Sequence, residues 1–258
     1  MTKLLAIETT GLRGSVACAE RGKLLTSELL RSDQRSAQSL IPAIESILKS
    51  RGWVPADLDG IAVAVGPGSF TGLRVGVTTA KVLAWACGAA LYGIDSLEAA
   101  AWTIAAALPA FLRNAPENPV YAEVLKRGAA FVSVALSAQR GDVASRGFLI
   151  RLGENRPIPR DESFRLEPLT DWIGRRSESA GPDGPLPLLY AGPPLASKRF
   201  KAIPAPDTAF LPEPFGTPSA DGVALAASAA SPADPFTLLP IYSRDSAAEE
   251  KRKWRNER

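Results

Sequence analysis

The segment that most constrains the fold lies at residues 60–94, where an apolar stretch, a glycine-rich turn, a helix-forming stretch and a second apolar stretch follow one another. Residues 60–65 read GIAVAV, and such an unbroken apolar run is typical of a strand buried on both faces. The turn GPGSFTG follows at 66–72, and the helix after it is expected to end near Gly88. A further strand is expected at 89–94 (AALYGI). Alternation of strands and helices in this way predicts an α/β domain.

The residues before this segment predict an antiparallel meander and a helix. Strands are expected at 3–8, 14–20 and 24–30, separated by short turns. Residues 36–51 then carry apolar side chains at i, i+1, i+4, i+7 and i+8, which predicts an amphipathic helix. An alanine-rich helix is expected at 96–108.

The second half of the chain has a different character, because 16 of the 22 prolines lie after residue 150. Candidate strands are 119–125, 129–137, 146–152 and 186–191, and the stretches 177–187 and 203–218 between and after them are rich in proline, glycine and serine. One late helix is expected at 219–230, with Ser219 as its N-cap. The end is expected to be strand-like at LLPIY (238–242) and then a charged tail.

Composition excludes several kinds of chemistry. The chain has no histidine, so a Ser-His-Asp triad, a histidine base and a histidine zinc site are all excluded. The two cysteines, Cys18 and Cys87, form no CxxC motif, which suits a reducing compartment. The apolar run near the N-terminus ends at Glu8 and is too short for a signal-peptide core, so we expect a cytoplasmic protein with no membrane span.

The GPGSFTG turn is open to three interpretations. A P-loop would need a lysine, and Leu73 and Arg74 stand where it should be. A dinucleotide-binding GxGxxG motif would need a third glycine where this chain has Thr71. The third interpretation is a strand-to-helix turn in which glycines supply conformational freedom and Ser69 or Thr71 caps the helix. Any such helix N-terminus could hold an anion without being built for it.

The helix after the turn carries a row of small residues at every fourth position, namely Gly72, Gly76, Ala80, Ala84 and Gly88. Such a row leaves a groove in which another helix can pack closely. The helix that fills it is either the chain's own helix at 36–51 or a helix of a partner protein. The sequence leaves both open.

Several motifs together resemble the TsaB (YeaZ) family, whose members take part in threonylcarbamoyladenosine modification of tRNA. Residues 61–84, IAVAVGPGSFTGLRVGVTTAKVLA, closely resemble the family's GPGSFTGLR signature. LLAIETT (4–10) resembles its opening motif, LIP (40–42) its helix motif, and PIYSR (240–244) its late motif. The similarity is strong over about residues 3–105 and short at the end.

The resemblance implies an actin-like ATPase fold, of the ribonuclease H-like type, with two related α/β lobes. The first lobe would span 1–108, with the segment 219–245 packing back on it, and the second 109–218, followed by a basic tail at 246–258. The second lobe is divergent, because Val124 and Phe131 replace an Asp and a Tyr of the family's pattern.

The same resemblance implies a partner interface and no catalytic residue. The helices near 36–51 and 71–87 would pair with TsaD, the related catalytic subunit, and the same surface would form a homodimer in its absence. The interface residues implied are Ile41, Ile44, Leu48, Ser69, Phe70, Thr71, Gly72, Arg74, Gly76 and Ala80. Ser96 and Ala100 stand where TsaD has its two metal-binding histidines, so no metal site is expected.

The implied partners are TsaD, the small ATPase TsaE and a threonylcarbamoyl-AMP synthase. ATP and metal would be bound by these partners, and this chain would need no cofactor. Contact with tRNA would be indirect or through the basic tail, whose last ten residues hold five basic side chains and Trp254. A solvated terminus is the other interpretation of that tail.

A second function, from a different class, also fits the residues. The chain would then be a self-sufficient ATP-dependent enzyme of the sugar-kinase and actin superfamily. Glu8, Thr9 and Thr10 would form a residual nucleotide loop, and Asp95 or Glu98 would act as base. A glycoprotease is disfavoured, because no histidine or zinc motif is present.

Overall fold

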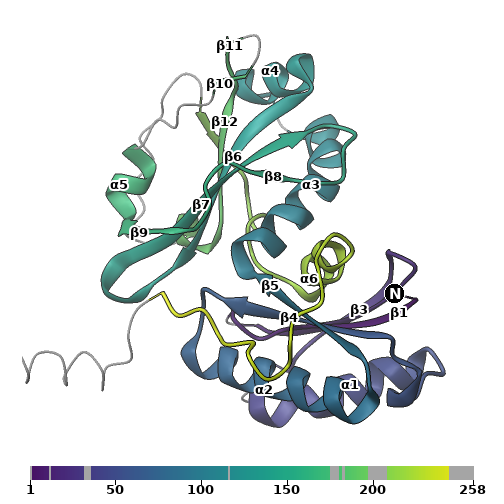
Figure 1. Cartoon of the computed structure of the whole chain (residues 1–258). Coiled ribbons are helices and arrows are strands. Elements are labelled where there is room, and N and C mark those ends of the chain that lie inside the picture. The colour runs from purple at the N-terminus through teal and green to yellow at the C-terminus, as the bar shows by residue number, and fades with distance from the viewer. Residues whose placement is uncertain are drawn as a thin grey trace, which may run out of the picture.

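Two β-sheets, each with its own helices, organise the chain in the computed structural model (Figure 1). The structure describes residues 2–11, 13–31, 36–115, 117–174, 180–181, 184–196 and 208–243. We refer to the part built on the first sheet as lobe 1 and the part built on the second sheet as lobe 2.

The sheet of lobe 1 has the strand order β3-β2-β1-β4-β5. The meander β1 (Lys3–Glu8), β2 (Ser15–Glu20) and β3 (Lys23–Leu29) is antiparallel. β4 (Gly60–Gly66) pairs in parallel with β1, and β5 (Ala90–Asp95) pairs in parallel with β4. This arrangement agrees with the meander and the strand–helix–strand order expected from the sequence.

Helices cover both faces of this sheet. The helices α1 (Ser36–Ser50) and α2 (Phe70–Cys87) lie on one face, where Leu5, Ile7 and Val63 of the sheet form a core with them. The helices α3 (Ser96–Asn114) and α6 (Ala220–Ala227) lie on the other face, over Leu4 and Ala6. The strands β1 and β4 are therefore buried on both sides, as their apolar sequences predict.

The sheet of lobe 2 repeats the strand order of lobe 1 and adds one strand. It runs β13-β12-β6-β7-β8, with β9 (Arg165–Pro168) also paired to β7. β6 (Ala129–Ser137) and β7 (Asp142–Arg151) form an antiparallel hairpin, whereas β12 (Leu188–Ala191) is parallel to both β6 and β13 (Thr208–Phe210). The short β8 (Ile158–Pro159) pairs with β7, and α5 (Leu169–Gly174) is a single short helix. β10 (Ala180–Gly181) and β11 (Gly184–Pro185) pair with each other and lie outside this sheet.

The helix α3 belongs to the cores of both lobes. Ala99 and Trp102 pack with α6 against the first sheet, whereas Leu97, Ile104 and Leu108 pack in the core of lobe 2. In Figure 1, α3 and α6 accordingly lie between the two sheets. The close approach of the two helices depends on Gly222, because a Cβ there would lie 2.0 Å from the carbonyl oxygen of Ala99.

The strand expected at 119–125 is wrong, because these residues form the helix α4 (Pro119–Arg127). The side chain of Asn118 caps the helix by accepting from the N–H of Val120 at 2.8 Å, and Pro119 occupies the first turn. Gly128 ends the helix in the left-handed conformation, with φ of 67°. These capping signals outweigh the strand preference of the valines and the tyrosine.

The strand-like segment expected at 238–242 forms no strand. It is part of an irregular segment, residues 233–243, which contains a turn at 235–237 and which we call the strap. Ala233 forms an isolated bridge with Leu91 of the edge strand β5, and the N–H of Ile241 donates to the carbonyl oxygen of Val65 at 2.6 Å. Lys81 Nζ of α2 donates to the carbonyl oxygen of Leu238 at 3.0 Å. The strap therefore runs beside α2 and holds it against the edge of the first sheet.

Candidate partner-binding face

The glycines of the GPGSFTG motif and of the following helix lie against the turn that follows β1. A Cβ on Gly68 would lie 2.5 Å from Cβ of Thr10, and a Cβ on Gly72 would lie 1.8 Å from the carbonyl oxygen of Thr9. A Cβ on Gly76 would lie 2.2 Å from Oγ1 of Thr9. Glycine is therefore required at these positions so that α2 can pack directly on the β1–β2 turn.

This contact corrects the expectation that the row of small residues forms a groove for another helix. Gly72, Gly76 and Ala80 are buried within lobe 1, and Ala84 is buried in the core under α2. Gly72 and Gly76 face the β1–β2 turn, whereas Ala80 and Ala84 lie in the core that α1 and α2 share with the sheet. The chain's own helix α1 therefore shares a core with the C-terminal part of the row, and Gly72, Gly76 and Ala80 of the expected interface are buried and have no surface to offer a partner.

Hydrogen bonds fix the turn to the start of α2. Thr9 Oγ1 donates to the carbonyl oxygen of Gly72 at 2.8 Å, and the N–H of Ser69 donates to the carbonyl oxygen of Thr10 at 2.9 Å. Ser69 is the N-cap of α2, since its hydroxyl accepts from the N–H of Gly72 at 3.3 Å. Of the two capping residues that the sequence allowed, Ser69 or Thr71, the structure selects Ser69.

The expected nucleotide loop, Glu8 to Thr10, is buried and its donors are engaged by the chain itself. Oε1 of Glu8 accepts hydrogen bonds from the N–H and the hydroxyl of Thr10 and, at 3.1 Å, from the N–H of Gly11. Glu8 is fully buried, and burial raises its pKa from 4.5 to about 7, against the lowering effect of these hydrogen bonds. This arrangement leaves these donors unavailable to a phosphate group unless the loop rearranges.

The other residues considered for catalysis have structural contacts. Asp95 is the N-cap of α3 and accepts from the N–H of Leu97 at 2.7 Å, and its second oxygen lies 3.9 Å from Nη1 of Arg146 in lobe 2. Burial raises the pKa of Asp95. Ser96 and Ala100 are fully buried in α3. Within the residues that the structure describes, no group of three His, Cys, Asp or Glu side chains is placed to hold a metal ion.

The exposed parts of α1 and α2 carry the remaining residues of the expected interface. Ile41 of α1 is 45% exposed, and Ser69, Thr71 and Arg74 are exposed at the start of α2. Ile44 and Leu48 belong mainly to the core, although each also lines a groove at the surface. The sequence therefore predicted the two helices correctly, but the predicted interface residues include core residues as well as surface residues.

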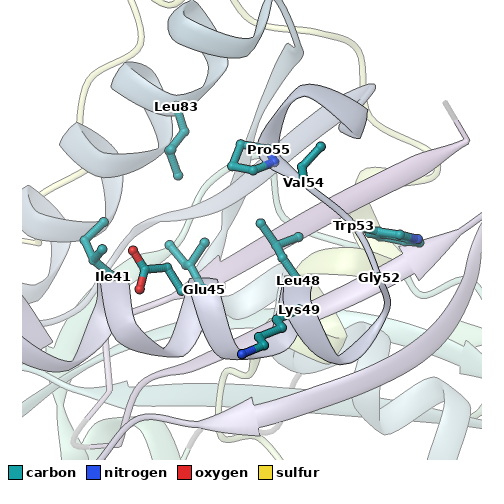
Figure 2. Close-up of a pocket in the computed structure, with 10 residues that line it drawn as sticks. Ile41, Glu45, Leu48, Lys49, Gly52, Trp53, Val54, Pro55 and Leu83 are labelled. Atoms are coloured by element: carbon teal, nitrogen blue, oxygen red, sulfur yellow. The ribbon is translucent and has the colours of Figure 1, made fainter.

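An apolar groove of about 520 Å³ lies between α1, α2 and the loop that follows α1 (Figure 2). Leu83 points from α2 toward α1, and Ile41 and Leu48 point back from α1. The loop closes the other end of the groove, and Glu45 and Lys49 supply the charged groups of its lining. The complete lining is Ile41, Ile44, Glu45, Leu48, Lys49, Gly52, Trp53, Val54, Pro55 and Leu83.

The strap joins this face at the start of α2 through a cluster of aromatic and cationic groups. The ring centroids of Phe70 and Tyr242 are 4.8 Å apart, and the guanidinium of Arg74 lies 4.0 Å from the centroid of the Phe70 ring. Arg74 Nε also donates to the hydroxyl of Tyr242 at 3.4 Å. Phe70 and Arg74 therefore contact the strap within the chain itself.

The largest exposed apolar side chains near this face were missed by sequence reasoning. Trp85 and Val82 of α2 are 73% and 57% exposed, and Phe236 and Leu239 of the strap are 82% and 70% exposed. A signal was present for Trp85, because a tryptophan next to Lys81 and Thr78 on the polar row of an amphipathic helix is unusual. No periodicity marks the strap residues, because the strap is neither a helix nor a strand.

The chain is similar in sequence to known proteins over part of its length. The family model described as "TsaD: tRNA N6-adenosine threonylcarbamoyltransferase" matches residues 31–122. The TsaB protein of Bacillus subtilis, a "tRNA threonylcarbamoyladenosine biosynthesis protein", is 35% identical over 95 residues, which is 37% of this chain and 42% of that protein. A tRNA N6-adenosine threonylcarbamoyltransferase of Sorangium cellulosum is 29% identical over 226 residues, which is 79% of this chain and 59% of that protein. The chain therefore spans about half the length of these curated relatives.

The similarity of fold extends over nearly the whole chain. The structure of YeaZ from Pseudomonas aeruginosa superimposes with a TM-score of 0.68, covering 94% of this chain and 100% of that one at 22% sequence identity. Together with the repeated sheet order, this similarity defines a protein of the actin-like fold with two related lobes, as the sequence predicted.

Within that class, the chain is similar over part of its length to the TsaB protein of Bacillus subtilis and to the TsaD family model, and its fold is that of YeaZ. None of the described helices is both long and apolar enough to cross a bilayer.

Proposed function

We propose that this chain is a non-catalytic subunit of a complex that makes threonylcarbamoyladenosine in tRNA, and that it pairs with and stabilises a TsaD-type threonylcarbamoyltransferase. The observation that carries the proposal is the face formed by α1, α2 and the strap. Ile41 is exposed there and lines an apolar groove, and Val82 and Trp85 of α2 are exposed as well. Exposed apolar surface of this kind marks protein–protein contacts, and aromatic side chains are enriched among the residues that dominate them.

The relatives supply the biological context of this proposal. The Bacillus protein is named for threonylcarbamoyladenosine biosynthesis, and the family model that matches residues 31–122 is that of TsaD. In the complex, TsaD would carry out the transfer with ATP or metal bound to the partner subunits. TsaE and a threonylcarbamoyl-AMP synthase would complete the pathway in the cytoplasm. Contact with tRNA would be indirect or through the basic tail.

The arrangement of the Glu8–Thr10 loop supports an accessory role over the alternative of an ATP-dependent enzyme. The hydrogen-bond donors of the loop are bonded to Glu8, and the turn is packed against Gly68, Gly72 and Gly76. Asp95, one of the two candidate bases, caps α3 and lies beside Arg146. A role as scaffold uses none of these groups and is consistent with all of these contacts.

Size-exclusion chromatography with light scattering tests the proposal. The chain is run alone and then mixed with the TsaD of the same organism. We expect a homodimer for the chain alone and a one-to-one heterodimer in the mixture. Absence of a complex at micromolar concentrations, together with ATP hydrolysis by the chain alone, would contradict the scaffold role and favour the enzyme.

A further inference from the structure

The carboxylate of Asp95 contacts both lobes, with one oxygen for each. Oδ1 accepts hydrogen bonds from the N–H groups of Leu97 and Glu98, at 2.7 and 3.0 Å, and so caps α3. Oδ2 lies 3.9 Å from Nη1 of Arg146 on β7 of lobe 2. At this separation the contact is a charge interaction rather than a hydrogen bond. Because the two oxygens have different partners, a proton on Oδ2 would leave the helix cap intact.

The guanidinium of Arg146 is held by lobe 2 independently of Asp95. Its Nε donates to the carbonyl oxygen of Asp161 at 3.0 Å, and its Nη2 donates to the carbonyl oxygen of Glu162 at 3.2 Å. The guanidinium also lies 5.6 Å from the centroid of the Phe148 ring. The two hydrogen bonds use the other two nitrogens and leave Nη1 facing lobe 1. Lobe 2 therefore presents a positioned positive charge to the start of α3.

This contact lies at the junction of the two lobes. Asp95 ends β5 and caps α3, and α3 packs in the cores of both lobes. That packing is apolar and non-directional, whereas a charge contact favours one position of the guanidinium. The side chains of Arg146 and Asp95 are only 12% and 17% exposed, so solvent screens their attraction weakly.

The charge on Asp95 is subject to opposing influences. Burial is the largest of them and raises the pKa of Asp95, Arg146 favours the ionised form, and Glu98 on the first turn of α3 disfavours it. Two further carboxyl groups lie at this end of the sheet. Glu8 ends β1, which runs parallel to β4 as β4 does to β5, and Asp221 is in the first turn of α6, which begins beside the end of β1. The charge on Asp95 can therefore respond to pH.

We propose that Asp95 and Arg146 form a proton-gated latch between the two lobes. The ionised carboxylate holds lobe 2 in the observed arrangement. Protonation of Oδ2 by solvent ends the charge contact and lets lobe 2 move relative to lobe 1 while α3 keeps its cap. The latch uses no residue of α1 or α2, so its test does not depend on pairing with TsaD.

Distances between spin labels in the two lobes test the latch. The labels are attached to Ser27→Cys on β3 and Ala122→Cys on α4, two exposed positions, after Cys18→Ala and Cys87→Ser have removed the native thiols. The labelled chain is diluted with unlabelled chain, so that only distances within one molecule are measured. This labelled chain is the reference for the variants.

Two variants release the latch in different ways at pH 8. Asp95→Asn keeps an oxygen for the cap but carries no charge, and Arg146→Gln removes the charge of lobe 2. We expect both to shift or broaden the interlobe distance distribution in the same way. Arg151→Gln is the matched control on β7, because the ion pair of Arg151 with Glu154 lies within lobe 2, and it should leave the distribution unchanged. Distributions of Asp95→Asn and Arg146→Gln that match the reference would overturn the proposal.

The pH dependence distinguishes a latch from a fixed structural contact. Between pH 8 and pH 5 the distribution of the reference should approach that of Asp95→Asn. The distribution of Asp95→Asn should stay constant, although Glu8, whose pKa is about 7, still titrates in this variant. A pH response that persists in Asp95→Asn would assign the movement to another group, and the proposal would fail.

NMR of the unlabelled wild type keeps the proposal testable if the variants do not fold. The Nε–H resonance of Arg146 and the hydrogen-exchange protection of the Leu97 amide are followed as the pH is lowered. We expect the Arg146 resonance to shift with a single midpoint while the Leu97 amide stays protected, since Oδ1 continues to accept its hydrogen bond. An unshifted Arg146 resonance, or loss of Leu97 protection at the same midpoint, would contradict the latch.

Discussion

The α-carbon of Gly72 faces the carbonyl oxygen of Thr9 so closely that a Cβ would lie 1.8 Å from that oxygen. The contact joins the first helical turn of α2 to the end of the first strand, 63 residues earlier in the chain, where Thr9 Oγ1 also donates to the carbonyl oxygen of Gly72. The glycine-rich motif is therefore explained by packing inside lobe 1. It brings a helix onto a turn at a distance that only glycine allows.

Replacing Gly72 by alanine is expected to lower the free energy of unfolding by about 2 kcal/mol or more, because the new methyl group meets a backbone carbonyl that cannot rotate away. Gly76→Ala should be milder, because its Cβ meets the hydroxyl of Thr9, a side-chain atom. Gly174→Ala is the matched control, because nothing lies within 4 Å of a Cβ there. Urea unfolding of the three variants measures the differences, and equal stability of Gly72→Ala and Gly174→Ala would contradict the packing.

The contact between Gly76 and Thr9 also changes how the effect of a large residue at position 76 is interpreted. If the row of small residues received a partner helix, Gly76→Leu would block pairing and leave the fold intact. Because Gly76 faces Thr9, the same substitution is expected to destabilise lobe 1 itself. Loss of pairing in Gly76→Leu is therefore no evidence about the interface unless circular dichroism and thermal unfolding show a native fold.

The pH dependence of stability should report the burial of Glu8. Its pKa is raised from 4.5 to about 7 by burial, so the native chain keeps this proton over a range in which the unfolded chain has released it. Its contribution to stability is complete below pH 4.5 and is lost as the pH rises through 7. The loss amounts to about 3 kcal/mol, since one unit of pKa corresponds to about 1.4 kcal/mol.

Glu8→Gln isolates this contribution, because glutamine keeps an accepting oxygen but does not titrate. Burial also raises the pKa of Asp95, which adds a dependence of the same sign, so the difference between variant and wild type is the informative quantity. Denaturant unfolding between pH 5 and pH 8 should show Glu8→Gln gaining stability relative to wild type as the pH rises. A constant difference across this range would contradict a raised pKa for Glu8.

Most of lobe 1 could be predicted because its signals are local. The meander strands, α1 with its apolar stripe, β4 and α2 were each expected within a few residues of their observed ends. The helix at 119–127 was missed because its valines and tyrosine favour strands, while its decisive signals are the cap at Asn118 and the stop at Gly128. In this segment the capping residues determine the helix, and the strand propensity of the residues between them does not.

The partners of individual side chains could not be predicted from spacing. The four-residue repeat of small side chains correctly indicated a close approach to α2, but periodicity carries no information about which segment approaches. The answer depends on Thr9, which is distant in sequence. The resemblance implied that the segment 219–245 packs back on the first lobe, but the contacts of the strap could not be predicted, because Ile241 and Leu238 are held by single contacts to Val65 and Lys81 rather than by a repeating pattern.

Trp85 is expected to contribute to pairing with TsaD while contributing little to stability. Its side chain is 73% exposed, so Trp85→Ala should change the free energy of unfolding by less than about 0.5 kcal/mol. If it lies at the centre of the interface, the variant should weaken pairing by about 2 kcal/mol, or roughly thirtyfold in Kd. Calorimetric titration with TsaD measures this change.

Leu125→Ala provides the matched control for that titration. Leu125 is an apolar residue of α4 in lobe 2, 45% exposed and away from α1 and α2. We expect it to leave the Kd unchanged. Equal Kd values for Trp85→Ala and wild type, with Leu125→Ala weakened instead, would move the interface to lobe 2.

The attachment of the strap should depend on the ring of Tyr242 and hardly at all on its hydroxyl. The ring packs against the Phe70 ring in a tilted arrangement, with the centroids 4.8 Å apart, whereas the hydroxyl accepts only a long bond of 3.4 Å from the exposed Arg74. Tyr242→Ala is therefore expected to cost about 1 kcal/mol of stability. Tyr242→Phe, which keeps the ring, should cost less than about 0.5 kcal/mol.

Hydrogen exchange of the Ile241 amide, which donates to Val65, measures the local opening of the strap. Faster exchange in Tyr242→Ala than in Tyr242→Phe is expected because only the alanine variant loses the contact with the Phe70 ring. Equal exchange in both would mean that the hydrogen bonds of Ile241 to Val65 and of Lys81 to Leu238 are sufficient to hold the strap.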